Sequence, residues 1–193
     1  MKEHEKDRSG TGGVGSTEVT AEMYDSIYTR RVISNYISHL DNTVIGDKLT
    51  KELRCTGFVS KRDPERYRIL LKRHMPAPVE RSANILDLGC GFGRLGCWLA
   101  KELCLNLIGL DFSSVAIKHA RLFARSQPRQ YRARFKVADF SATGLAAGSA
   151  CCVVSLDALY LAVDQLKVLR EIRRILIPDG PVVTKNSIRA AGL

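Results

Sequence analysis

Residues 85–96 read ILDLGCGFGRLG. The first four residues form an apolar run interrupted by one acid, Asp87, which is typical of a buried strand that ends at a functional edge. Four glycines follow, and a helical pattern begins at Arg94. Because glycine permits tight turns and lets a ligand approach the main chain, this stretch predicts a strand, a ligand-binding turn and a helix. The ligand that the turn holds is the question that decides the chemistry.

The rest of the chain repeats this rhythm of short apolar runs and helix-length amphipathic segments. We expect strands at residues 85–88, 105–110, 134–138, 151–156 and 181–184, and helices at 94–103, 114–125 and 164–176. Ser113 is the expected cap of the second of these helices. Such alternation predicts an α/β fold with a doubly wound, mostly parallel, Rossmann-like sheet of five strands and right-handed crossovers.

The first 80 residues lack this alternation. Residues 1–17 are rich in glycine, serine and charge, and we expect a disordered tail. Residues 18–80 should form a helical cap on the sheet domain, which spans residues 81–193. Within the cap, apolar residues at i+4 steps predict a helix over 20–40, and a short helix is expected at 47–55. A third helix is expected to have the following features: Asp63 as cap, Pro64 at its start, Pro76 and Pro78 at its end, and Tyr67, Leu70, Leu71 and His74 on its packed face.

Composition restricts the class of protein. The 193 residues suit one domain with a helical addition, and their net charge is +10, with most of the excess in residues 81–193. The six cysteines include no C-x-x-C pair, so we interpret them as reduced core thiols and expect no metal site. No apolar run approaches the roughly 20 residues that cross a bilayer, and residues 1–17 do not resemble a secretory signal. We therefore expect a cytoplasmic protein that does not span a membrane.

The charge of Asp87 distinguishes two ligands for the turn. Residues 91–96 fit the G-x-G-x-x-G spacing of a nicotinamide dinucleotide site. A carboxylate at 4 Å from a pyrophosphate charge, however, costs about 1 kcal/mol even in bulk water. S-adenosylmethionine instead presents an ammonium that Asp87 could accept from, and a carboxylate that the N–H groups of the helix start could bind. The sequence therefore favours S-adenosylmethionine as cofactor.

The motif ILDLGCGFGR resembles the first motif of the class I S-adenosylmethionine-dependent methyltransferases, and the resemblance continues in order over about residues 84–187. NLIGLD, VADFS, VVSLDAL and EIRRILIPDG resemble the motifs that follow in that family. The resemblance implies three groups of cofactor-binding residues: Asp87, Gly89, Cys90, Gly91 and Gly93 for the methionine end, Asp111 for the ribose, and Phe112, Asp139 and Phe140 for the adenine.

Several of these residues have plainer interpretations. Asp111 could cap the helix near Ser114, and Asp139 could be a turn residue. Methyl transfer chiefly requires alignment, so a base is optional. Asp157 is the catalytic candidate, but it could equally position the acceptor or serve as a turn acid. His39 and His74 are further candidate bases, although each fits a surface or packing role better.

The acceptor is less constrained. Tyr24-Asp25 and Tyr28 resemble the amino-terminal helix that in small-molecule members folds over the cofactor, so Tyr28 joins the expected cofactor contacts; an aromatic stripe that only covers the sheet is the alternative. We expect a small-molecule acceptor. RNA is the rival, because residues 112–138 carry seven cations and no acid: Lys118, Arg121, Arg125, Arg129, Arg132, Arg134 and Lys136.

The family's sheet usually has seven strands, and residues 181–193 leave no room for the last two. The fifth strand should therefore have an unpaired edge, through which an oligomer could form unless the amino-terminal helices cover it. A further hypothesis follows: a truncated or diverged methyltransferase-like protein that binds cofactor weakly and catalyses little.

Overall fold

The computed structural model describes residues 20–33, 62–80, 82–127 and 132–185. The elements of these ranges are α1 (Ala21–Ile33), α3 (Asp63–His74), β1 (Asn84–Leu88), α4 (Arg94–Leu103), β2 (Asn106–Asp111), α5 (Ser114–Ser126), β3 (Ala133–Val137), β4 (Cys152–Leu156), η2 (Leu159–Leu161), α6 (Gln165–Ile175) and β5 (Val182–Lys185). The expected tail at 1–17, the helix at 47–55 and His39 lie outside the described residues.

The five strands form one parallel sheet in the order β3-β2-β1-β4-β5. The order reverses between β1 and β4, and this is the place where open parallel sheets bind ligands, at the carboxyl ends of the strands. Asp87 near the end of β1 pairs in register with Gly109 of β2 and Val154 of β4. The expected doubly wound α/β fold is confirmed, and it places Asp87 at the switch point.

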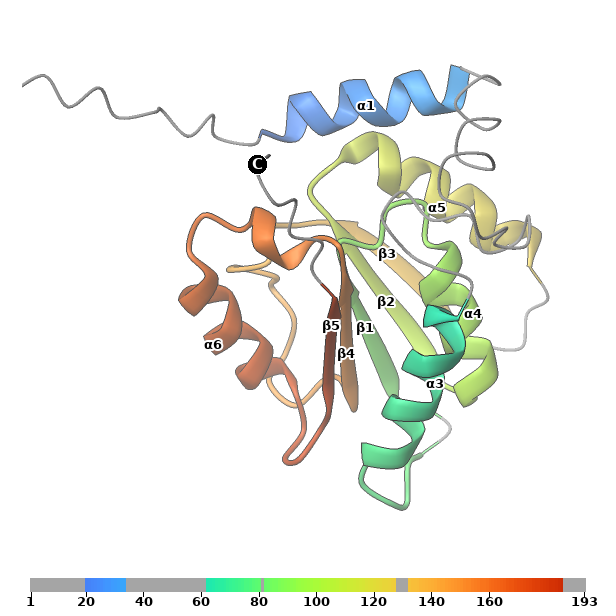
Figure 1. Cartoon of the computed structure of the whole chain (residues 1–193), viewed down its shortest axis with the longest axis vertical. Coiled ribbons are helices and arrows are strands. Elements are labelled where there is room, and N and C mark those ends of the chain that lie inside the picture. The colour runs from blue at the N-terminus through green and yellow to red at the C-terminus, as the bar shows by residue number, and fades with distance from the viewer. Residues whose placement is uncertain (1–19, 34–61, 81, 128–131, 186–193) are drawn as a thin grey trace, which may run out of the picture.

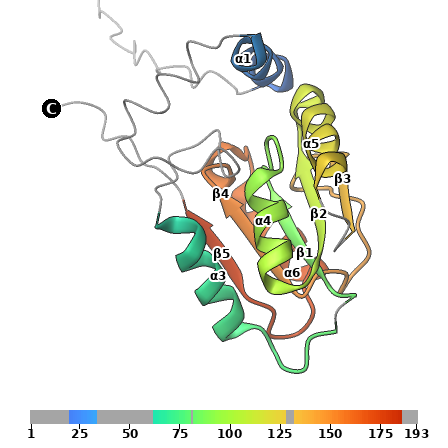
Figure 2. The same ribbon diagram turned by 90° about the vertical axis from the view of Figure 1, so that its right-hand side faces the viewer.

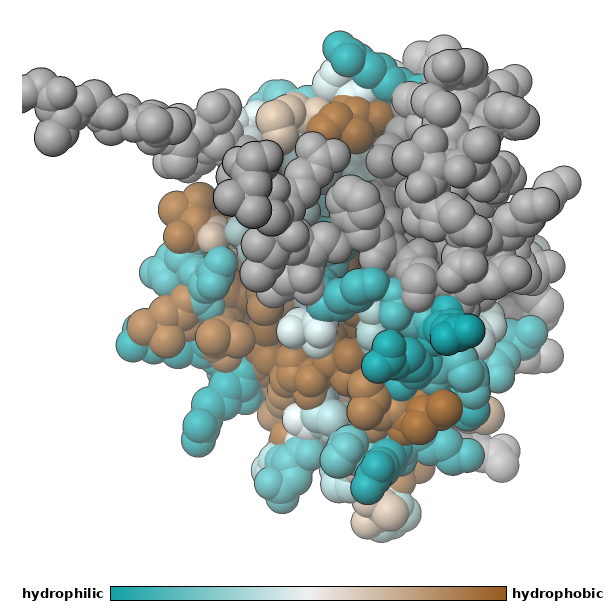
Figure 3. Space-filling view, in the orientation of Figure 1, coloured by the Kyte–Doolittle hydropathy of each residue, from teal (hydrophilic) through white to brown (hydrophobic). Residues whose placement is uncertain are grey.

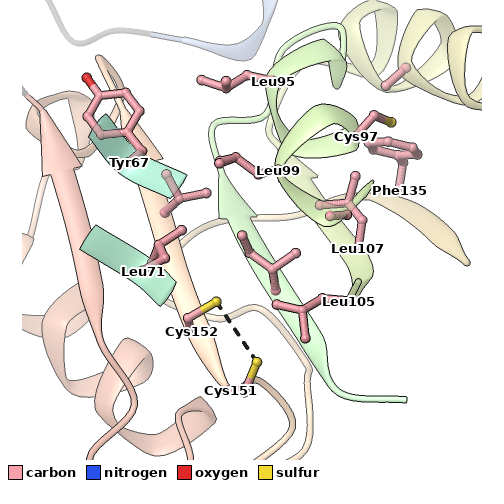
Figure 4. Packing of buried hydrophobic residues seen from close by; sticks show 14 of the residues in the cluster. Tyr67, Leu71, Leu95, Cys97, Leu99, Leu105, Leu107, Phe135, Cys151 and Cys152 are labelled. Atoms are coloured by element: carbon pink, nitrogen blue, oxygen red, sulfur yellow. Dashed lines mark hydrogen bonds between the residues drawn. The ribbon is translucent and has the colours of Figure 1, made fainter. Parts of the chain in front are cut away.

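Helices cover both faces of the sheet (Figures 1 and 2). α3, α4 and α5 pack on one face, where Leu71, Leu99 and Ile117 meet the apolar side chains of the strands. Figure 4 shows this core around Leu99 and Leu107. On the other face Val168 and Ile172 of α6 pack against a second buried cluster. Because both faces are covered, the central strands are almost continuously apolar, as parallel strands require.

The capping prediction was right for one helix and wrong for another. Ser113 caps α5 by accepting from the N–H of Ala116, and Asp164 caps α6. Asp63, however, is the first residue of α3 rather than its cap, and its carboxylate accepts from Lys185 Nζ at 2.5 Å. An ion pair with a residue distant in the sequence thus takes the place of the expected capping contact at the start of α3.

Two further predictions about side chains were wrong. Leu70 and His74 are exposed on α3, where Tyr67 and Leu71 alone of the expected face are buried. All five described cysteines are free thiols, but Cys104 is exposed rather than part of the core. Its backbone explains the position, because Cys104 has a φ of +56° and ends α4 in the left-handed conformation.

β5 is the outermost strand of the described sheet and pairs there with β4 alone. α3 lies beside it, and the Lys185–Asp63 ion pair joins the end of β5 to the start of α3. Figure 3 shows apolar side chains gathered over α6 and β5, and Leu166, Leu169 and Val182 are among those exposed. An oligomer through this strand stays a prediction. None of the described helices has the length and apolar character to cross a membrane.

Candidate functional site

The glycine turn (residues 89–93) is tied to the neighbouring strand. The N–H groups of Gly89 and Cys90 donate to the Leu110 carbonyl at 2.8 and 3.0 Å, and the N–H of Gly93 donates to the Cys90 carbonyl at 2.8 Å. Gly89 and Gly93 have φ values of +78° and +71°, which side chains rarely adopt. Gly93 is also the N-cap residue of α4, whose first turn has no capping side chain. That turn therefore presents main-chain N–H groups towards the carboxyl edge of the sheet.

Close packing beneath the turn also requires glycine. A Cβ on Gly89 would lie 2.2 Å from the Ala158 Cβ, and one on Gly93 would lie 2.7 Å from the Phe135 ring. A Cβ on Gly109 of β2 would meet the same ring at 2.5 Å. Phe135 of β3 thus fills the space below the turn. The sequence pattern did not single out this residue, because a phenylalanine in a strand carries no signal of a distant partner.

Asp87 lies buried between β1 and α4. It is 5% exposed, and a Cβ at Gly96 would lie only 2.5 Å from its Oδ2, so the absence of a side chain at Gly96 makes room for the carboxylate. Burial, and then the negative charge of Asp111, raise the pKa of Asp87 to about 7. In the described part of the chain no hydrogen bond to this carboxylate offsets its burial. A buried acid with a strongly perturbed pKa, at a strand end, is a signature of a functional site.

Asp111 holds the turn from the next strand. Its Oδ2 accepts from the N–H of Gly91 at 2.9 Å, and its Oδ1 accepts from the N–H of Ser113 at 2.9 Å. It is 2% exposed, and burial raises its pKa although these hydrogen bonds act in the opposite direction. Because the Ser113 hydroxyl caps α5, Asp111 is not itself the helix cap. Its oxygens hold the turn to the loop after β2, and each oxygen retains a lone pair that could accept another hydrogen bond.

A cavity of about 340 Å³ opens beside the ends of β2 and β3. Phe112, Asp139 and Phe140, expected to surround an adenine, all line it. The remaining wall residues come from the start of the β3–β4 connection and from the η2–α6 region: Ala138, Ser141, Leu161, Ala162, Val163, Asp164, Lys167 and Val168. The Phe140 ring also comes within 3.5 Å of where a Gly89 Cβ would be, which joins the cavity to the glycine turn.

Asp139 is exposed, and its Oδ1 accepts from the N–H of Ser141 at 2.6 Å. The residue is therefore a turn residue, as its plainer interpretation held, and it also borders the cavity. This hydrogen bond occupies one carboxylate oxygen, and an adenine contact for Asp139 stays a prediction.

α1 lies across the carboxyl edge of the sheet in both ribbon views, next to α5 (Figures 1 and 2). Tyr28 is 5% exposed, and its ring centroid lies 5.1 Å from that of Phe92 in the glycine turn. The Tyr24 ring packs on Phe112 at 5.0 Å. Tyr28 therefore reaches the turn rather than the sheet faces, and cofactor contact stays a prediction for it.

Asp157 follows β4 in the left-handed conformation, with a φ of +56°. Its N–H donates to the Lys185 carbonyl at 2.6 Å. Burial, and then the charge and hydrogen bond of Asp157, raise the pKa of Tyr160. The residue is thus at the correct edge of the sheet, and its catalytic role stays a prediction. His74 ends α3, about 16 Å along the helix from the Asp63–Lys185 pair, so it is far from this edge.

Five of the cations that were expected to contact a nucleic acid lie on α5 and β3, at the side of the sheet, and Arg132 immediately precedes β3. Arg121 donates to the Phe135 carbonyl at 2.7 Å, and Lys136 donates to the Thr143 carbonyl at 3.0 Å. These two side chains therefore stabilise the protein's own backbone. Arg129 lies outside the described residues, and the nucleic-acid alternative gains no support from the geometry of the others.

A doubly wound parallel sheet, with a glycine turn at its switch point and acids at the ends of β1 and β2, defines an α/β domain that binds a nucleoside-containing cofactor. Residues 85–180, about half of the chain, match the family described as methyltransferase domain. The chain belongs to the class I S-adenosylmethionine-dependent methyltransferases, as its motifs implied. The cofactor of that family is S-adenosylmethionine.

Relatives support the same family. Norajmaline N-methyltransferase of Rauvolfia serpentina is 27% identical over 106 residues, which cover 55% of this chain and 36% of that protein. Tocopherol O-methyltransferase of Arabidopsis thaliana is 29% identical over 100 residues, 52% of this chain and 29% of that protein. The chain thus spans about a third of the length of these relatives.

Among solved structures, a methyltransferase from Geobacter sulfurreducens in complex with S-adenosyl-L-homocysteine has a TM-score of 0.54 and 21% identity. The similarity covers 68% of this chain and 50% of that one. At this identity it establishes the fold alone.

Proposed function

We propose that this chain binds S-adenosylmethionine and transfers its methyl group to a small-molecule acceptor. The observation that supports the proposal best is the buried carboxylate of Asp87, at the start of the glycine turn, with a pKa of about 7 and no hydrogen bond in the described structure that offsets its burial. A ligand ammonium would supply both a positive charge and hydrogen bonds there. A nucleotide pyrophosphate would add negative charge instead.

The remaining residues fit the other parts of the cofactor. The uncapped first turn of α4 offers N–H groups to a carboxylate, and the helix dipole favours that charge. Asp111 retains lone pairs for ribose hydroxyls. Phe112 and Phe140 give the cavity apolar walls for a purine, and Asp139 adds a polar edge. When bound, S-adenosylmethionine supplies an activated methyl group on a sulfonium, so the protein has to align the acceptor and exclude water.

A small-molecule acceptor is favoured by two observations. The two relatives named above act, by their names, on norajmaline and tocopherol, which are small organic molecules. α1 also places aromatic rings over the carboxyl edge, where Tyr24 and Tyr28 pack on Phe112 and Phe92. Such rings exclude water and suit an organic acceptor. Asp157 with Tyr160 lies at the end of β4 and could orient an acceptor hydroxyl or amine.

Calorimetric titration with S-adenosylmethionine, S-adenosylhomocysteine and NAD tests the cofactor. We expect micromolar binding of the first two and none of NAD; tight binding of NAD alone would contradict the proposal. A second experiment follows transfer of a radiolabelled methyl group to pooled alkaloid, phenol and prenylated acceptors, with transfer RNA as the comparison. Label on RNA that is lost at high salt would favour the nucleic-acid acceptor, and binding without any transfer would favour the methyltransferase-like protein.

A further inference from the structure

Asp25 of α1 reaches the amino terminus of α5, 88 residues further along the chain. Its Oδ1 accepts from the Ser113 hydroxyl and from the N–H of Val115 at 3.2 Å, and its Oδ2 accepts from the Ser114 hydroxyl at 3.0 Å. A carboxylate at the start of a helix is favoured by the unpaired N–H groups and by the helix dipole. Asp25 therefore gives α1 a specific attachment point on the sheet domain.

The attachment favours the ionised form of Asp25. Partial burial alone would raise its pKa, but the hydrogen bonds from Ser113, Val115 and Ser114 lower the pKa below its usual value. At neutral pH the carboxylate is thus charged, and both its oxygens are held. An exposed side chain of α1 without such contacts would have neither a lowered pKa nor hydrogen bonds to both oxygens.

Ser113 joins this attachment to the glycine turn. Its hydroxyl donates to Asp25, while its N–H donates to Asp111 Oδ1. Asp111 in turn accepts from the N–H of Gly91. Two hydrogen-bonded carboxylates therefore meet at one serine, and a continuous chain of contacts runs from α1 to the turn that faces the cofactor.

The aromatic residues on either side of Asp25 complete the contact. Tyr24 precedes it and packs on Phe112 of the cavity wall, and Tyr28 lies one helical turn later and packs on Phe92 of the glycine turn. The two rings lie next to each other, with centroids 6.0 Å apart, and each packs on a different part of the site. The hydrogen bonds of Asp25 restrict the rotation of α1 about its axis and its distance from α5. They therefore also restrict the positions of both rings.

We propose that Asp25 is a positioning residue that holds α1 closed over the glycine turn and the cavity, so that bound cofactor leaves slowly. This inference rests on the proposed function. Asp25 does not act merely as the cap of α5, because the Ser113 hydroxyl already caps that helix by accepting from Ala116. Loss of Asp25 should consequently release α1 and leave the sheet domain intact.

Three variants separate the possibilities. Asp25→Ala removes every hydrogen bond of the attachment. Asp25→Asn keeps one acceptor oxygen for Ser113 and Val115 but cannot accept from Ser114 with its amide nitrogen. Glu22→Gln is the matched control, because Glu22 is an exposed acid on the same helix. Hydrogen exchange of residues 20–33 in the ligand-free chain measures docking of α1, and stopped-flow dissociation of S-adenosylhomocysteine measures its effect on the site.

We expect Asp25→Ala to speed exchange in α1 and dissociation of the ligand by roughly tenfold, the effect of losing a helix-terminal carboxylate. Asp25→Asn should recover part of both, Glu22→Gln should match wild type, and the sheet domain should remain folded in all three, as thermal unfolding would show. Wild-type exchange and dissociation in Asp25→Ala, or an equal loss in Glu22→Gln, would overturn the role of Asp25. A wild-type chain that binds neither cofactor form would instead overturn the proposed function.

Discussion

Asp87→Asn removes the charge from a buried acid and keeps nearly the same shape. Moving the pKa of Asp87 from 3.8 to about 7 corresponds to about 4 kcal/mol against the ionised form in the folded chain. Relaxation of the surrounding structure and entry of water reduce this penalty on the ionised form. We therefore expect Asp87→Asn to be about 2 kcal/mol more stable than wild type at pH 7.5 without ligand. The same variant loses the charge that would hold the cofactor ammonium, and we expect binding to weaken at least tenfold.

The raised pKa of Asp87 also predicts how the free energy of unfolding depends on pH. Because the pKa of Asp87 is higher in the folded chain than in the unfolded chain, the folded chain binds the proton more tightly between about pH 4 and pH 7. The contribution of Asp87 to wild-type stability therefore falls as pH rises through this window. The advantage of Asp87→Asn should be absent near pH 4 and complete above pH 7.

Urea denaturation at pH 4.5, 6 and 7.5 measures the free energy of unfolding, and calorimetry measures cofactor binding. Asp179→Asn is the control, because Asp179 is exposed in a turn where asparagine also tolerates the φ of +59°. A variant that is less stable than wild type at pH 7.5, or that binds S-adenosylmethionine as well as wild type, would refute the electrostatic argument for Asp87.

Three further predictions follow from the same site. At pH 6, binding of S-adenosylmethionine should release about one proton from Asp87, measured as a binding enthalpy that changes with the ionisation enthalpy of the buffer; an enthalpy independent of buffer would contradict this. Gly96→Ala should weaken binding at least tenfold despite the better helix propensity of alanine, because its Cβ would lie 2.5 Å from Asp87 Oδ2; a more stable variant with normal binding in the same titration would show that the carboxylate has room to move. Asp111→Ala should weaken binding by about 1 to 3 kcal/mol in calorimetry through the loss of the Gly91 and Ser113 hydrogen bonds, and wild-type affinity would remove its assignment.

Local signals in the sequence were sufficient for the elements of the sheet domain. The helix expected at residues 94–103 has those bounds in the structure, because Gly93 allows its start and Cys104 ends it. The expected strands are displaced by at most one residue. Parallel strands buried on both faces are nearly all apolar, and polar turn residues separate them clearly in a single sequence.

Interactions between distant segments could not be read from the sequence. Asp63 has the pattern of a helix cap, but the folded chain brings Lys185 to it. Phe135, Gly96 and Asp25 have their roles only because other elements approach them in space. The acids near the ends of β1 and β2 were predictable, since each lies at the carboxyl end of an apolar run, whereas the way in which Asp111 is held was not.

The glycine turn owes its shape to contacts made entirely within the protein, from the Leu110 carbonyl and from Asp111. Such a turn is preorganised, so a ligand that enters it incurs little entropic penalty for ordering the backbone. Changes to the segments that meet the acceptor can therefore accumulate without rebuilding this half of the molecule. An engineer who wished to redirect the chemistry would leave β1, β2 and their loops untouched and vary α1 and the residues around it.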